Sequence, residues 1–118
     1  MSMSMRFRRL WLQVGRAVCV AAVALGCSSF QAARLYHSGT AALDRGDSVR
    51  AVGDLERAAE LQPEASEVQN HLGLAYQAAG RDRDAELAFE RAVALDCDNS
   101  AAAENLRVTQ ARSAGVSP

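Results

Sequence analysis

The residues that could bind a metal ion are few in this 118-residue chain, and their spacing is unfavourable. His37 and His71 are equivalent in an internal repeat, but no cysteine or carboxylate accompanies both at the spacing of a metal site. Asp96 begins a stretch similar to a calcium loop, yet Ala101 and Arg107 stand where that loop requires Gly and a bidentate Glu. We therefore expect no metal ion and no cofactor.

Catalytic chemistry is also poorly supported. No serine, cysteine or carboxylate pair has the neighbours that an activated nucleophile needs, so we expect a protein that is not an enzyme. Cys19, Cys27 and Cys97 are an odd number at long spacings, which indicates no disulfide framework. Arg45-Gly46-Asp47 spells an adhesion tripeptide, but it falls on an expected tight turn that accounts for it.

Charge is distributed unevenly along the chain. The first 26 residues contain four arginines and no acid, whereas the fourteen acidic residues all follow Cys27, against nine arginines there, giving about −5. Binding to the phosphate backbone of a nucleic acid needs clustered cationic side chains, so we do not expect nucleic acid as a partner.

The amino-terminal stretch has the pattern of a signal peptide. A basic leader is followed by nine apolar residues, 17–25, a run shorter than the roughly 20 that a membrane-spanning helix needs. Val23-Ala24-Leu25-Gly26-Cys27 resembles the lipobox of bacterial lipoproteins, although Ala24 and Leu25 depart from its preferred residues. The resemblance implies a signal peptide over 1–26, lipidation of Cys27 and a tether over 27–31. With Ser28 next to Cys27, it also implies attachment to the periplasmic face of the outer membrane.

Other interpretations of the leader remain open. Cleavage after Ala22-Val23-Ala24 would release a soluble periplasmic protein, and an uncleaved leader would be a permanent anchor. An arginine-rich leader without acids is also typical of a mitochondrial transit peptide.

The rest of the chain is organised around one 34-residue unit that occurs twice, at 32–65 and 66–99. Nine positions match without a gap: His37/His71, Gly39/Gly73, Ala41/Ala75, Gly46/Gly80, Ala51/Ala85, Glu56/Glu90, Arg57/Arg91, Ala58/Ala92 and Leu61/Leu95. This period indicates a helix–turn–helix repeat, and the units resemble tetratricopeptide repeats.

The pattern predicts an all-α protein, and the resemblance implies a short α-solenoid of two helix–turn–helix repeats. We expect helices over about 33–45, 48–61, 66–79 and 82–95, a capping helix over 100–112 and a flexible tail over 113–118. Gly46 and Gly80 should end the first helix of each unit, and Asp47 or Ser48 should cap the second. Ser66 and Gln69 are predicted to form a capping box.

The small residues predict close helix packing. Gly39 and Gly73 lie within helices, where Gly costs roughly 1 kcal/mol relative to Ala, so another helix should approach closely. The resemblance implies Ala51 and Ala85 as their partners, and Ala58 and Ala92 as contacts with the next helix. The expected core and structural positions also include Leu55, Leu61, Pro63, Leu72, Tyr76, Leu87, Phe89, Val93, Leu95 and Leu106.

A protein-binding groove is implied by the same resemblance, on the first helix of each unit. Carried over by repeat position, its residues are Tyr36, Thr40, Leu43, Asn70, Leu74, Gln77, Glu104 and Val108. Its mixed apolar and polar character suits an extended or helical segment of a protein partner.

These observations favour an adaptor or scaffold without catalytic activity, anchored by lipid, that assists assembly of a pilus, a secretion channel or outer-membrane machinery. A permanent structural subunit and a soluble periplasmic chaperone-like module are the alternatives. Because repeats are stabilised by neighbours and about three are usually needed, two repeats also suggest self-association or docking on a larger partner.

Overall fold

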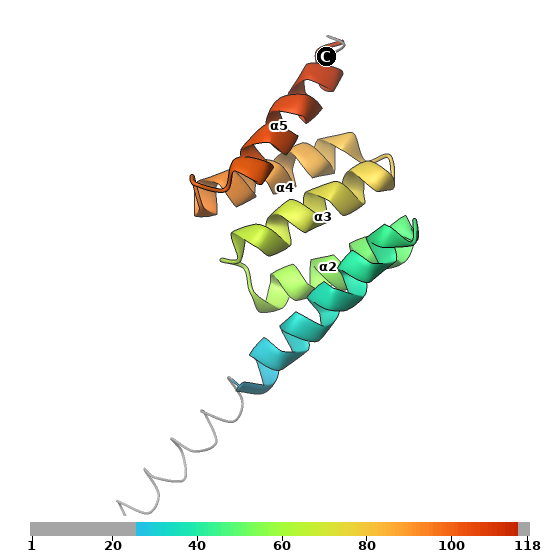
Figure 1. The fold of residues 1–118 in the computed structure, drawn as a ribbon, viewed down its shortest axis with the longest axis vertical. Helices are drawn as coiled ribbons and strands as arrows, with labels where there is room; N and C mark the ends of the chain where they lie inside the picture. Colours follow the sequence, from blue (N-terminus) through green and yellow to red (C-terminus); the bar gives the residue numbers. More distant parts are fainter. Residues whose placement is uncertain (1–25, 116–118) are drawn as a thin grey trace, which may run out of the picture.

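A computed structural model describes residues 26–115, which form five helices and no strand (Figure 1). The first helix occupies residues 26–44 in the part described, and it is followed by α2 (Ser48–Leu61), α3 (Ser66–Ala78), α4 (Asp82–Leu95) and α5 (Ser100–Ser113). The predicted all-α class is confirmed. The expected start of the first helix near Ala33 is wrong, since residues 28–31 already belong to it.

Helices that follow one another in the chain pack side by side. α2 contacts α3, α3 contacts α4, and α4 contacts α5, while α3 also touches α5 (Figure 1). The first helix reaches α3 through Tyr36, whose hydroxyl donates a hydrogen bond to Glu67. α3 therefore lies at the centre of the molecule, with contacts to each of the other four helices.

The turns follow from local chemistry, largely as the sequence predicts. Gly46 and Gly80 have φ angles of +76° and +73°, the left-handed conformation that glycine adopts without a Cβ penalty. Asp47 caps α2 by accepting a hydrogen bond from the Arg50 amide at 3.1 Å. Asn99 caps α5 in the same way, by accepting from the Ala102 amide at 3.0 Å.

The predicted capping box at the start of α3 is wrong. Ala65 occupies the cap position and Ser66 is already helical, so the serine side chain points to other partners. Its hydroxyl donates to the Ala92 carbonyl at 2.8 Å and accepts from Asn99 Nδ2 at 2.9 Å. Ser66 thus joins the beginning of α3 to the end of α4 and the cap of α5.

The core is built largely from alanine, with a few large side chains between the helices. Leu55 and Phe89 are completely buried, as are Ala51, Ala58, Ala85 and Ala92. The atoms nearest to a side chain added at either helix-internal glycine belong to a large residue. A Cβ at Gly39 would meet Leu55 first, and a Cβ at Gly73 would meet Phe89 first. The large side chains therefore occupy the space that the glycines leave.

Two expected core residues are on the surface. Leu87 and Leu95 remain 47% and 42% exposed. The buried positions of α4 are Ala85, Ala88, Phe89 and Ala92, and Leu87 lies off that stripe. Leu95 continues the spacing of the stripe, but it is the last residue of the helix, where the packing ends.

The leader lies outside the residues described, apart from Gly26, and so does the end of the tail, residues 116–118. Within residues 26–115, no helix combines the length and the hydropathy that crossing a membrane requires.

Candidate functional site

The groove residues predicted from the sequence lie on the first helix, α3 and α5. Tyr36 contacts α3 at two points: its hydroxyl donates to Glu67 Oε1 at 2.9 Å and lies 3.2 Å from His71 Nδ1. The rings of Tyr36 and His71 meet edge to face, with centroids 5.2 Å apart. Tyr36 therefore ties the first helix to α3.

Burial and the Glu67 hydrogen bond shape the chemistry of this tyrosine. Removal from water, followed by the hydrogen bond and the charge of Glu67, raises the pKa of Tyr36 to about 12. His71 Nδ1 also lies 3.0 Å from the Glu67 carbonyl, which can only accept, so this ring nitrogen donates to it. The arrangement holds a neutral phenol and offers no activated nucleophile.

The contact between α3 and α5 repeats the one between the first helix and α3. Asn105 Nδ2 donates to Asn70 Oδ1 at 2.9 Å, and these residues are separated by 35 positions, as Tyr36 and His71 are. Gln77 Nε2 also donates to the hydroxyl of the buried Thr109, at 2.7 Å. The polar groups of Asn70 and Gln77 are thus engaged inside the chain.

The remaining predicted groove residues differ in what they offer to a partner. Thr40 donates to the His37 carbonyl of its own helix, and the exposed Glu104 pairs with Arg107 at 2.7 Å. Leu43 packs against the core cluster. Leu74 and Val108, both half-buried, are apolar side chains at equivalent positions of adjacent helices, and Thr40 shares that position.

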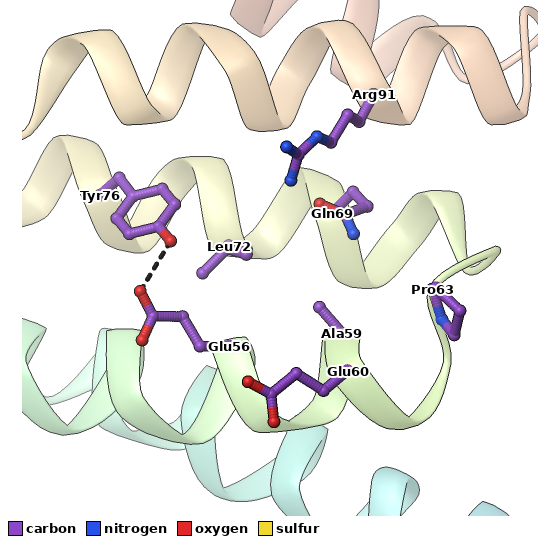
Figure 2. A pocket seen from close by; sticks show the side chains of 8 residues that line it. All are labelled: Glu56, Ala59, Glu60, Pro63, Gln69, Leu72, Tyr76 and Arg91. Carbon is purple, nitrogen blue, oxygen red and sulfur yellow. Dashed lines mark hydrogen bonds between the residues drawn. The ribbon is translucent and has the colours of Figure 1, made fainter.

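A second surface lies between α2, α3 and α4, and Figure 2 shows the side chains around it. A pocket of about 340 Å³ is lined by Glu56, Ala59, Glu60, Pro63, Gln69, Leu72, Tyr76 and Arg91. A smaller one of about 170 Å³ shares Leu72, Tyr76 and Arg91 and extends to Asp84, Leu87 and Ala88. At 100° per residue, Gln69 and Leu72 lie on the order of 140° around α3 from the groove positions Asn70 and Leu74. We call this surface the α2–α4 groove.

A polar network surrounds Tyr76, which lines both pockets of the α2–α4 groove. Tyr76 donates to Glu56 Oε1 at 2.7 Å, as drawn in Figure 2, and the Arg81 guanidinium lies 4.4 Å from the centroid of the tyrosine ring. Arg81 also pairs with Asp84 at 2.7 Å and with Glu56 at 3.8 Å. Burial, followed by the Glu56 hydrogen bond, raises the pKa of Tyr76 to about 12. Glu56 and Asp84 therefore have partners already.

The other polar groups of this groove have none among residues 26–115. Gln69 is 5% exposed, and its Oε1 is buried without a hydrogen-bond partner. Arg91 reaches from α4 towards α3 (Figure 2) and forms no ion pair with a described residue, and the same holds for Glu60 on α2. This groove was not predicted from the sequence. The available signal was the spacing of Gln69, Leu72 and Tyr76, which places a glutamine on the buried face of a helix.

Other reactive side chains are dispersed. Across the described part of the chain, no three His, Cys, Asp or Glu residues gather as they would around a metal ion. Cys27 and Cys97 are free thiols on the surface, and Cys27 is the second of the residues described.

Comparison with models of known protein families gave no match, and no curated protein proved significantly similar to the chain.

Proposed function

We propose that this chain is an adaptor without catalytic activity, built from two repeats of the tetratricopeptide type and a capping helix. In this proposal the repeats are 32–65 and 66–99, and α5 is the capping helix. The array holds a segment of a partner protein on the face formed by the first helix, α3 and α5.

One observation carries the proposal: the two contacts with the same offset of 35 residues, Tyr36 with His71 and Asn70 with Asn105. Equal offsets mean that α3 packs on the first helix in the same register as α5 packs on α3. Thr40, Leu74 and Val108, which share one repeat position, are then expected to form a strip across three helices. A strip with apolar side chains and a polar border is the kind of surface that holds a peptide or a helix.

The proposed attachment of the protein to a membrane rests on Cys27. Cleavage before this residue would place the lipidated cysteine directly at the start of the first helix, so the repeats would sit close to the membrane. Acylation by two or more chains gives stable attachment, because each buried methylene contributes about 0.8 kcal/mol. An anchored adaptor of this kind suits the assembly of an envelope complex at the periplasmic face of the outer membrane.

The binding face is tested by affinity purification of the full-length protein in detergent from the membranes of cells that make it. A protein that co-purifies with the wild type should be lost when Tyr36→Ala and Leu74→Ala are combined, with the circular dichroism spectrum unchanged. Val49→Ala is the matched control, because Val49 is 83% exposed on α2. Retention of the partner by the double variant would refute the assignment of this face.

The anchor is tested separately. Cys27→Ser should abolish metabolic labelling with a fatty-acid analogue and move the protein out of the membrane fraction. Unchanged labelling and fractionation would refute the lipid anchor and leave the binding face untouched.

A further inference from the structure

We infer that the α2–α4 groove is a second protein-binding site, which takes an extended peptide segment that carries a basic side chain. This site goes beyond the proposed function, since it lies on a different side of α3 from the face assigned above. Its residues are Glu60 on α2, Gln69 and Leu72 on α3, and Leu87 and Arg91 on α4.

Gln69 lines the larger of the two pockets. Its side-chain oxygen is buried and receives no hydrogen bond from the described chain, although 95% of the residue's surface is covered. Native proteins pair almost all such atoms, because burying an unpaired acceptor costs free energy that water would otherwise supply. A leucine here would avoid that cost. In the pocket, Gln69 Nε2 can donate to a ligand, and this gives the glutamine a role.

Charged side chains also line the groove. Arg91 and Glu60 border the same pocket from opposite helices, and neither forms an ion pair with a described residue. Glu56 and Asp84, the other charged residues of the groove, are occupied by Tyr76 and Arg81. An incoming ligand therefore finds one available guanidinium on the α4 side and one available carboxylate on the α2 side.

Apolar side chains line the same groove. Leu72 and Ala59 line the pocket, and Leu87 stands 47% exposed in the adjoining one. The larger pocket, about 340 Å³, is at the lower end of the sizes that hold ligands, and it adjoins the smaller one through the shared residues Leu72, Tyr76 and Arg91.

An extended peptide satisfies all three requirements. Its backbone carbonyl oxygens would accept from Arg91 and from Gln69 Nε2. A lysine or arginine side chain of the peptide would pair with Glu60, and an apolar side chain would cover Leu72 and Leu87. A second copy of this chain fits less well, because the residues after Cys27 carry a net negative charge that would repel Glu60.

The test uses the full-length protein in detergent and a displayed library of random twelve-residue peptides. Selection should enrich sequences with a basic residue close to an apolar one. Binding of the enriched peptides should weaken about tenfold or more in Arg91→Ala and in Gln69→Leu, since each removes a directed hydrogen bond to the peptide. Arg83→Ala, an exposed arginine of the same helix that lines neither pocket, should bind within about twofold of the wild type.

Three results would overturn the inference. One is a library that yields no peptide sensitive to both Arg91→Ala and Gln69→Leu. Another is a set of peptides blocked by Leu74→Glu instead, which would place all binding on the other face. The last is a dimer in analytical ultracentrifugation that Arg91→Ala dissociates, which would make a second copy the occupant. None of these results alters the test of the face formed by the first helix, α3 and α5.

Discussion

The ring of Phe89 fills the space that a side chain at Gly73 would need: a Cβ there would lie 2.6 Å from the ring carbon Cδ1. Leu55 stands in the same relation to Gly39 in the first unit, also at 2.6 Å, from its Cγ. In both units, therefore, a glycine on one helix accepts a large side chain from a residue 16 positions later. This pairing sets how closely the two helices of a unit approach.

Gly73→Ala should consequently destabilise the protein by about 1–3 kcal/mol, because the new methyl group overpacks a completely buried ring. Gly53→Ala is the matched control, since Gly53 lies inside α2 with nothing within 4 Å of its would-be Cβ. That change should stabilise by about 0.5–1 kcal/mol through the better helix propensity of alanine. Urea unfolding measures both. Equal effects of the two changes would contradict the packing described.

Asn99→Ala should cost more than Asp47→Ala, although both residues are helix caps. Asp47 accepts one amide hydrogen bond at an exposed turn, for which about 1 kcal/mol is expected. Asn99 does the same for α5 and also donates to Ser66, so about 2 kcal/mol is expected. The free energies of unfolding of the two variants decide this. A smaller loss for Asn99→Ala would show that the link to Ser66 contributes nothing.

Stability should fall at alkaline pH because of two tyrosines. The pKa values of Tyr36 and Tyr76 are raised from 10.0 to about 12 in the folded chain. A tyrosine whose pKa is higher in the folded than in the unfolded chain contributes its full stabilisation below the unfolded pKa. This contribution is lost as pH rises from 10 towards 12. After discounting for partial exposure, we expect a loss of about 2 kcal/mol in total.

Urea unfolding at pH 9, 10 and 11.5 measures this loss, and the chain contains no lysine whose titration would overlap. Replacing both tyrosines with phenylalanine should flatten the dependence. A slope that persists in the double variant would assign the alkaline loss to other groups.

Gln69→Leu should raise the free energy of unfolding by about 1 kcal/mol, because it removes a buried oxygen without a partner. Gln77→Leu, in the same helix, should lower it by about 1 kcal/mol, since Gln77 donates to the buried Thr109. Opposite signs for two identical substitutions are the expected outcome. A loss of stability in Gln69→Leu would mean that the glutamine is satisfied within the chain.

The helices and their turns were predictable because the signals are local. Gly46 and Gly80 mark left-handed turns, Asp47 is a cap, and α4 begins and ends where its pattern indicates. Ser66 was misassigned because its partners, Ala92 and Asn99, come from distant parts of the sequence. A capping box and a long-range hydrogen bond use the same hydroxyl, and spacing alone does not distinguish them.

The sites were predictable only in part. The repeat assigned Asn70 and Gln77 to the expected groove, but it gave no sign that both are engaged by α5. The interpretation of the α2–α4 groove as a binding site depends on the lack of ion-pair partners for Arg91 and Glu60 among the described residues. The spacing of residues in the sequence does not show which ion pairs are absent. Leu87 was expected in the core from its hydrophobicity alone. Its position on α4 lies outside the buried stripe of that helix, so the side chain is exposed.

The central claim, that the first helix, α3 and α5 form a protein-binding face, is tested most directly by site-specific photo-crosslinking in cells that make the protein. A photoreactive amino acid at Thr40 or Val108 should give the same discrete adduct with a partner, and the Thr40 adduct should disappear when Leu74→Glu is added. The same label at Val49, 83% exposed on α2, should give none. Adducts that form equally from Val49, or that survive Leu74→Glu, would contradict the claim.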